Sequence, residues 1–449
     1  DLLHQLVNKS LVVVDQQGEN SRYRMLETLR EYASEKLQGH GESETVRARH
    51  FGYYLALAEK ASPANLLGAR LDQWFNAVKA DLDNVRVAFA WSQSQADRGE
   101  KSLRLATALG PFWQLLKNFS EGGLWLEHAL ARADPANAEL TSWGIVWLAF
   151  TLFYASPRSF ALATEAHQRF TVLNQPDGLA LANLLLGIWA VARGEAATAI
   201  ACLQQACVQF EQKQAVYLLG RAYFYLADAF GLTGKREQAL DYYRRAFQLG
   251  KSGDGYSAFQ WVWRSMALID PGEALALCQN QLIRQRQRQN QTKVAGLLRM
   301  LGHICTAAGD LPGALAALTE SLALWEKLGI DWHRGGGAGR VCLDLALVQY
   351  LCQEHQAAMV YAQKAIHLFQ EAGDLHRVAY AYVALGYPAL AVNDLSLASA
   401  SFQRCIQIIT AQEINCTYLA LVGLAEIARC QAKPALAARL FGATERFAQ

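Results

Sequence analysis

The stretch RAYFYLADAFGLTGKREQALDYYRRAFQL, residues 221–249, decides the fold. It predicts two short helices, each with one apolar stripe at three- and four-residue spacing. The stripes are formed by Tyr223, Leu226, Ala227 and Phe230 in the first helix and by Ala239, Tyr243, Ala246 and Leu249 in the second. Gly234 ends the first helix, because glycine adopts a positive φ at little cost. One such hairpin cannot bury its own apolar face, so the stretch predicts neighbours of the same build.

Sequence repeats supply these neighbours. Small residues recur at intervals of 35 to 44 residues at Ala161, Ala199, Ala239, Ala274, Ala314, Ala358, Ala398 and Ala437. A turn residue precedes several of them by five positions, as at Gly194, Gly309 and Asn393. Leucine followed by glycine recurs earlier in the same units, as in Leu186-Gly187, Leu301-Gly302 and Leu385-Gly386. The pattern resembles the tetratricopeptide repeat, although the spacing is longer than that family's period of about 34 residues. We therefore expect an all-α superhelix of about eight helical hairpins over residues 136–449.

Composition excludes several classes of protein. Of the 449 residues, 52% are hydrophobic, which is enough for a continuous core, and the formal net charge of +2 does not favour nucleic acid or a membrane surface as partner. The nine cysteines form no CxxC pair, so we expect reduced thiols in a cytoplasmic protein. The chain begins at Asp1 inside a predicted helix, and we expect it to be part of a longer protein.

Residues 1–62 differ in kind from the rest. An amphipathic helix, two short strands around Gly18 and a second helix predict a small winged-helix domain. Its basic residues are offset by acidic ones, which makes direct DNA binding the weaker interpretation. Residues 63–135 are predicted to form a helical bridge with a degenerate first repeat.

Four segments carry a resemblance to a known family. LVNKSLVVVD with RYRMLETLREYASEKL, then RARHFGYYLALAE, then DLDNVRVAFAW, and finally GLAEIARCQAKPALAARLFGATERF are similar to bacterial STAND regulators. These signal-transduction ATPases, including maltose-activator-like and antibiotic-regulator-like members, place a nucleotide-binding core before a winged helix and a helical-repeat sensor. The resemblance implies that ATP or ADP binds a core outside this chain. Leu26 departs from the family, since many members carry a histidine that contacts ADP at this position.

No catalytic motif accompanies this resemblance. The chain contains no GxxxxGK[ST], HExxH or GxSxG, so we expect no enzyme activity, cofactor or metal within it. The glycine cluster Arg334–Arg340, RGGGAGR, lacks the lysine and hydroxyl that would bind phosphate and Mg²⁺. We interpret this cluster as a flexible loop between two repeats.

The first helix of each tetratricopeptide repeat lines the concave groove, and this resemblance gives a candidate ligand-binding strip. Its residues are Trp143, Phe150, Ile188, Phe224, Asp228, Phe259, Trp263, Arg299, His303, Tyr350 and Tyr387. Aromatic rings supply contact area, and the charged members could orient a polar group. Tight curvature would instead bury these rings as core, and the sequence leaves both alternatives open.

These observations together predict a sensor arm. An inducer, peptide or protein would bind the concave groove and signal through the winged helix to the nucleotide-binding core of the same polypeptide. One alternative is a constitutive tetratricopeptide scaffold that holds protein partners without a switch. A DNA-binding regulator acting through residues 1–62 is the weaker alternative.

Overall fold

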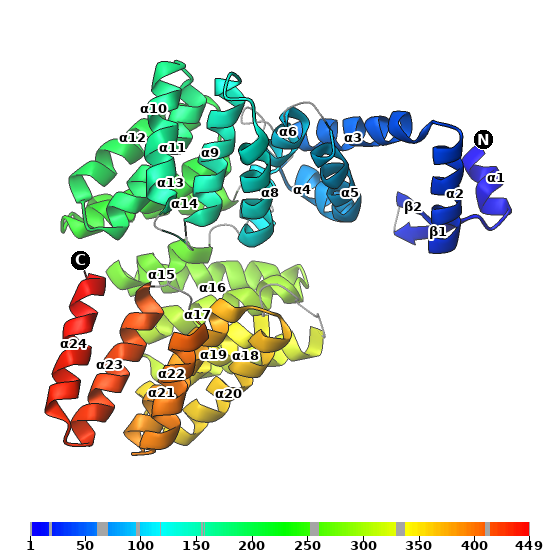
Figure 1. The fold of residues 1–449 in the computed structure, drawn as a ribbon. Helices are drawn as coiled ribbons and strands as arrows, with labels where there is room; N and C mark the ends of the chain where they lie inside the picture. The colour runs from blue at the N-terminus through cyan, green and yellow to red at the C-terminus, as the bar shows by residue number, and fades with distance from the viewer. Residues whose placement is uncertain are drawn as a thin grey trace.

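The computed structural model describes residues 2–17, 20–60, 71–95, 99–116, 118–153, 156, 158–251, 260–328, 337–408 and 414–448. These residues form 24 helices and one two-stranded sheet, arranged as stacked helix pairs (Figure 1). The prediction of an almost all-helical repeat protein is confirmed. Within the described ranges no helix is both long and apolar enough to cross a membrane.

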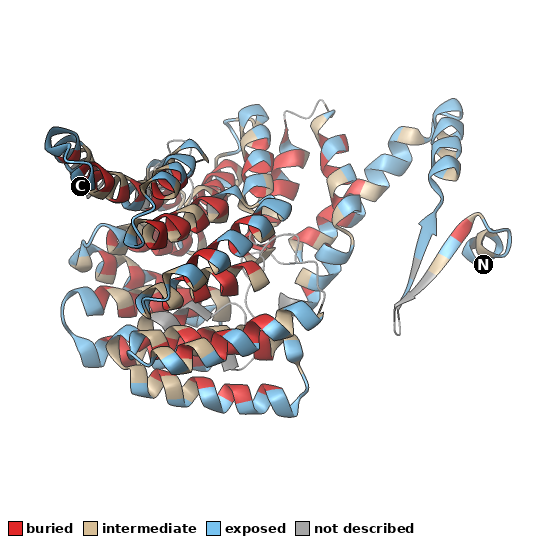
Figure 2. Ribbon diagram, turned by 90° about the horizontal axis from the view of Figure 1, so that it is seen from below, coloured by how far each residue is buried: buried red, intermediate tan, exposed pale blue. Residues whose placement is uncertain are grey.

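The N-terminal module lies apart from the repeats, at the far end of a long helix (Figure 1). It consists of α1 (Leu2–Asn8), β1 (Val12–Gln17), β2 (Asn20–Met25) and α2 (Glu27–Gly39), and α3 (Ser43–Glu59) joins it to the rest. The two strands pair antiparallel, from Val12 opposite Met25 to Gln17 opposite Asn20. The predicted order of helix, hairpin and helix is therefore present. Figure 2 shows most of this module exposed, and α2 has no buried residue.

A group of shorter helices connects α3 to the repeats. They are α4 (Leu71–Ala80), α5 (Leu82–Gln93), α6 (Glu100–Ala108), α7 (Gly110–Leu116) and α8 (Phe119–Arg132). One hydrophobic cluster begins at Phe51 in α3 and continues through these helices as far as Ile304. It runs across the predicted division after residue 135, and the divisions after residues 62 and 135 stay predictions. A second cluster extends from Cys305 to Ile427.

Eight helix pairs complete the described chain. They are α9 (Ala138–Leu152) with α10 (Arg158–Val172), α11 (Pro176–Ala192) with α12 (Ala196–Gln212), α13 (Val216–Leu232) with α14 (Arg236–Lys251), α15 (Gln260–Ile269) with α16 (Pro271–Gln287), α17 (Gln291–Ala307) with α18 (Leu311–Leu328), α19 (Gly337–Leu351) with α20 (His355–Glu371), α21 (Leu375–Ala391) with α22 (Leu395–Ile408), and α23 (Ile414–Cys430) with α24 (Pro434–Ala448). First helices of successive pairs contact one another, as α17 does α19 and α19 does α21. The first helices therefore form the inner layer of the stack.

The turns inside these pairs confirm the predicted turn residues. Gly194, Gly234 and Gly309 have φ values of 75°, 72° and 80°, and Asn393 has a φ of 62°. At each turn the following N–H bonds back across the helix end, as Lys235 N–H donates to the carbonyl of Phe230 at 3.1 Å. This is the bond pattern of a helix that ends in a left-handed residue.

The leucine–glycine dipeptides have a packing role. A Cβ at Gly187 would lie 2.5 Å from Cγ of Leu203, and a Cβ at Gly302 would lie 2.5 Å from Cγ of Leu318. Leu203 and Leu318 each follow the small residue of their second helix by four positions. Glycine thus lets the branched side chain of the second helix reach the backbone of the first.

The predicted register is wrong in one repeat. Ala161 is exposed on α10, whereas Ala163 and Ala166 are fully buried. The turn before α10 includes residues outside the described ranges, and the sequence there has no glycine or asparagine five positions before Ala163 to mark the register. The small residues at the other seven positions of the series, from Ala199 to Ala437, are buried.

The close contact between α11 and α12 at Gly187 leads to a prediction about stability. Gly187→Ala should lower the free energy of unfolding by about 1–3 kcal/mol, because the new methyl group overlaps Leu203. Gly442→Ala in α24 is the matched control, since a Cβ there meets nothing within 4 Å. It should be neutral or stabilising by up to about 1 kcal/mol, because alanine favours helix. Urea denaturation checks both, and equal effects would contradict the packing role of Gly187.

Candidate functional site

An ionic cluster joins two successive helices of the inner layer. Arg299 of α17 donates from Nε to Oδ2 of Asp344 in α19 at 2.5 Å. His303, one turn further along α17, places Nε2 3.2 Å from the same oxygen. The side chains of Arg299 and His303 are 20% exposed and that of Asp344 is 13% exposed. The structure thus brings together two residues of the predicted strip, Arg299 and His303, through a carboxylate that the sequence analysis missed.

The charge state of Asp344 follows from its neighbours. Burial alone would raise the pKa of this carboxyl, since a charge is costly to desolvate. Arg299 and His303 outweigh this effect, and together they hold the pKa of Asp344 below its ordinary value. The carboxylate is therefore ionised at neutral pH and is the centre of the cluster.

Two further arginines lie next to this cluster, and the sequence analysis missed both. Arg340 stands in the first turn of α19 and Arg377 in the first turn of α21. Asp374 caps α21 by accepting from the backbone N–H of Arg377 at 3.1 Å, and it also accepts from the Arg377 guanidinium. The interpretation of Arg334–Arg340 as a loop is wrong for its second part, because α19 begins at Gly337. Residues 334–336 lie outside the described ranges.

A sequence signal for these arginines existed. Arg299, Arg340 and Arg377 precede the small residues Ala314, Ala358 and Ala398 of their repeats by 15, 18 and 21 residues, so each lies on the first helix of its repeat, although at a different position.

Most aromatic and aliphatic members of the predicted strip pack between helices. Phe150 and Ile188 are each 1% exposed and Phe224 is 6% exposed. Trp143 is partly buried, with its ring centroid 5.1 Å from that of Phe170 in its own helix pair. For these residues the structure favours the core alternative. Phe259 lies outside the described residues, as does the side chain of Trp263.

Asp228 also serves helix packing. Its carboxyl accepts a hydrogen bond from the Tyr243 hydroxyl of the paired helix α14, and Ser265 of α15 bonds to it as well. Burial raises the pKa of Asp228 to about 6, and the two hydroxyls only partly oppose this effect. With no cation among its hydrogen-bond partners in the described residues, Asp228 differs chemically from Asp344.

Tyr350 and Tyr387 are the partly exposed aromatic members on the later inner helices. The Tyr387 hydroxyl donates to the carbonyl of Leu419 in α23 at 2.9 Å, and burial raises its pKa to about 12. The Tyr350 ring lies 5.6 Å from that of His355. Both rings therefore have packing contacts and some exposed surface within the same half of the chain as the ionic cluster.

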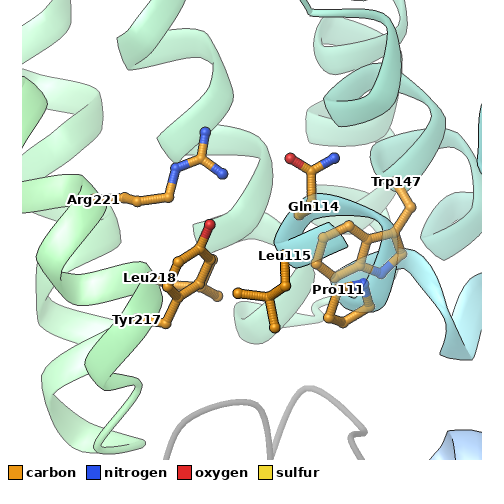
Figure 3. Close-up of a pocket in the computed structure, with 7 residues that line it drawn as sticks. All are labelled: Pro111, Gln114, Leu115, Trp147, Tyr217, Leu218 and Arg221. Carbon is orange, nitrogen blue, oxygen red and sulfur yellow. The ribbon is translucent and has the colours of Figure 1, made fainter. Parts of the chain in front are cut away.

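A small pocket lies between α7, α9 and α13 (Figure 3). It is lined by Pro111, Gln114, Leu115, Trp147, Tyr217, Leu218 and Arg221. Its enclosed space has room for about one water molecule. The Arg221 guanidinium lies 5.3 Å from the centroid of the Phe150 ring, and Gln114 Nε2 is buried without a hydrogen-bond partner among the described residues. This pocket suits one bridging water and is too small for an inducer. Among the described residues no cluster of metal-ligating side chains occurs.

Comparisons with known proteins give partial likenesses. No protein-family model matches the chain. A Mycobacterium tuberculosis protein named "Putative HTH-type transcriptional regulator Rv0890c" is 43% identical over 131 residues, 29% of this chain, and a Mycobacterium bovis protein of the same description matches equally. The matched part is only 14% of the length of these relatives.

Solved structures show a likeness in fold alone. A Rap protein complexed with Competence and Sporulation Factor matches 90% of this chain and 97% of its own, with a TM-score of 0.50 and 12% identity. A STAND protein with a tetratricopeptide repeat sensor from Pyrococcus horikoshii matches 78% of this chain and 52% of its own, with a TM-score of 0.38 and 18% identity. The Rap likeness extends over nearly the whole helical stack.

The ionic cluster predicts a pH-dependent stability. Asp344→Asn should lower the free energy of unfolding at pH 7 by about 2 kcal/mol, because Arg299 loses its ionised partner. The pKa of Asp344 is depressed in the folded state, so this contribution is present above about pH 4 and is lost as the pH falls further. Urea denaturation at pH 7, 5 and 3.5 should therefore show the deficit shrinking. Asp83→Asn is the control, since Asp83 is 94% exposed, and a deficit independent of pH would contradict the assignment.

Asp228 predicts the opposite pH dependence. Its folded-state pKa of about 6 is raised, so its ionisation opposes folding as the pH rises from about 4 through 6. Asp228→Asn keeps the acceptor for Tyr243 and removes the charge. The variant should gain stability over the wild type by about 1–2 kcal/mol between pH 4 and pH 7. If the difference in denaturation midpoint between the variant and the wild type stays constant over this range, ionisation of Asp228 does not oppose folding and the prediction is wrong.

Proposed function

We propose that this chain is the sensor arm of a STAND-type regulator. In this proposal residues 1–62 are the winged helix, and the inner layer of the repeats binds an inducer ligand, peptide or protein. The chain itself has no enzyme activity, and ATP or ADP binds a core elsewhere in the same polypeptide. The relative named as an HTH-type transcriptional regulator supports transcription as the output.

The observation that carries the proposal is the position of the cluster formed by Arg299, His303 and Asp344. It joins the first helices of two successive repeats, so its strength affects how these repeats sit against each other. A ligand that competes for Arg299 or Asp344 changes the balance between two arrangements of the stack. Such a ligand shifts the population only by the difference in its affinity for the two arrangements.

The N-terminal module supports the relay to a core. Tyr23, Leu26 and Tyr32 are 51%, 48% and 58% exposed, so the surface of this small unit carries three exposed large side chains. We propose that the nucleotide-binding core covers this surface. Leu26 contributes packing there and no hydrogen bond to a phosphate, since its side chain has no polar atom.

Nucleotide release from the full-length protein tests the proposal. Arg299→Ala should change the release rate of a fluorescent ADP analogue by about fivefold or more, because it weakens the link between two inner helices. Arg244→Ala is the matched control: it breaks an arginine–glutamate pair, to Glu273 at 2.7 Å, between second helices. We expect this control to release nucleotide at the wild-type rate.

Two results would contradict the proposal. One is a folded Arg299→Ala protein that releases nucleotide at the wild-type rate. The other is a native reading frame that encodes no GxxxxGK[ST] motif upstream of Asp1. Either result would leave the constitutive scaffold as the better account of the repeats.

A further inference from the structure

Arg340 occupies an unusual position for an arginine. It lies in the first turn of α19, between α17 and α21 in the inner layer, and its side chain is only partly exposed. Its Nε is buried and meets no hydrogen-bond acceptor within the described ranges. A buried donor without an acceptor costs stability, and the cost is larger when the donor is charged.

The charges around Arg340 do not balance. In the described part of the chain, the charges of Arg299 and Arg377 and those of two carboxylates, Asp344 and Asp374, act on Arg340. Arg299 and His303 contact Asp344, and Arg377 forms an ion pair with Asp374. Asp374 in addition caps α21 through its other oxygen. Among the residues that the structure describes, Arg340 is therefore left without a carboxylate of its own.

The cost of burying the Arg340 charge also favours the binding of an anion. Burial and the charges of Arg377 and Arg299 lower the pKa of Arg340 to about 9, despite the attraction of Asp374 and Asp344. The Arg340 guanidinium is still charged at pH 7, so loss of a proton does not remove the free-energy cost of its burial. An incoming anion would relieve it, because it would offer the missing acceptor and neutralise the surplus charge. The N-terminus of α19 lies at the same place, and its partial positive charge also favours an anion.

A guanidinium also selects the kind of anion. Its planar fork of N–H donors matches the two oxygens of a carboxylate or two oxygens of a phosphate. The partial exposure of Arg340, Arg299 and Arg377 leaves a route for such a group from solvent. A large apolar ligand would have no acceptor to offer at this point.

We propose that Arg340, flanked by Arg299 and Arg377, binds an anionic group of a ligand, either a carboxylate or a phosphate. The proposal deepens the sensor function above by naming the chemistry of the ligand, and it rests on that function only for the effect of binding. Anion binding itself is a property of this chain and can be measured without the nucleotide core.

The test titrates the chain with two probes, inorganic phosphate and succinate, against sodium chloride of equal ionic strength. Thermal unfolding and calorimetry should show saturable binding of at least one probe that chloride does not reproduce. Preference for phosphate or succinate then distinguishes the two sources of the anion. Nitrogen-15 NMR of the arginine Nε–H groups should show the Arg340 signal shifting along the same titration curve.

Variants test the residue directly. Arg340→Met should weaken binding of the effective probe by about tenfold or more, because it removes the charged donor. The variant should fold, since replacing a buried charge that lacks a partner with an apolar chain of similar length is tolerated. Arg340→Lys should retain part of the binding. Arg245→Met, on the exposed side of α14, is the control and should bind like the wild type.

Three outcomes would overturn the proposal: no saturable binding of either probe, unchanged binding by Arg340→Met, or an Arg340 Nε–H signal that does not move. Wild-type anion binding together with failure of the Arg299→Ala nucleotide-release test would sink the sensor function and leave the anion site. If Arg299→Ala changes nucleotide release as expected but no anion binds, the sensor function stands and the anion site is ruled out.

Discussion

The close contact between the two helices of a pair is the constraint on which the rest of the structure depends. Gly187 and Gly302 have no side chain, so Leu203 and Leu318 reach the backbone of the first helix, and Gly386 does the same for Phe402. A pair held this closely presents an apolar surface to the next pair, and the stack grows by repetition. Stability is therefore spread along the chain, and individual inner positions are free to carry charge.

That freedom is used mainly in the later repeats. Between α9 and α13 the inner layer is filled mainly by rings and aliphatic chains such as Phe150, Ile188 and Phe224, with Arg221 buried beside the Phe150 ring, and the pocket at Arg221 has room for one water. Around α17, α19 and α21 the same layer carries arginines, aspartates and His303. Charged groups cost more than apolar ones to bury, so a cluster kept at this depth is better explained by a task than by stability alone.

The sequence predicted the repeats well because their signals are local. Gly194, Gly309 and Asn393 are needed where the chain takes a positive φ, and such residues are recognisable without knowledge of the rest of the fold. The candidate ligand-binding strip was harder to predict from the sequence. The burial of Phe150 or Phe224 depends on superhelical curvature, which no local pattern encodes. Arg340 was missed for a related reason: its glycine-rich surroundings indicate a loop, and only contact with α17 and α21 makes it part of a site.

Asp228 and Asp344 show how one residue type acquires two roles in the same layer. Both stand on first helices and both are largely buried, yet burial raises the pKa of one while arginine and histidine lower the pKa of the other. Asp228 bonds to hydroxyls, which satisfy a neutral acid as well as an ionised one, and it behaves as a link between helices. Asp344 bonds to the guanidinium of Arg299 and lies near two further arginines, Arg340 and Arg377. Two hydroxyls bond to Asp228, whereas beside Asp344 the described arginines outnumber the described carboxylates, and an external anion can balance such a charge. The place where a ligand has most to contribute is thus the inner layer around Arg340, and not the aromatic strip that the sequence made conspicuous.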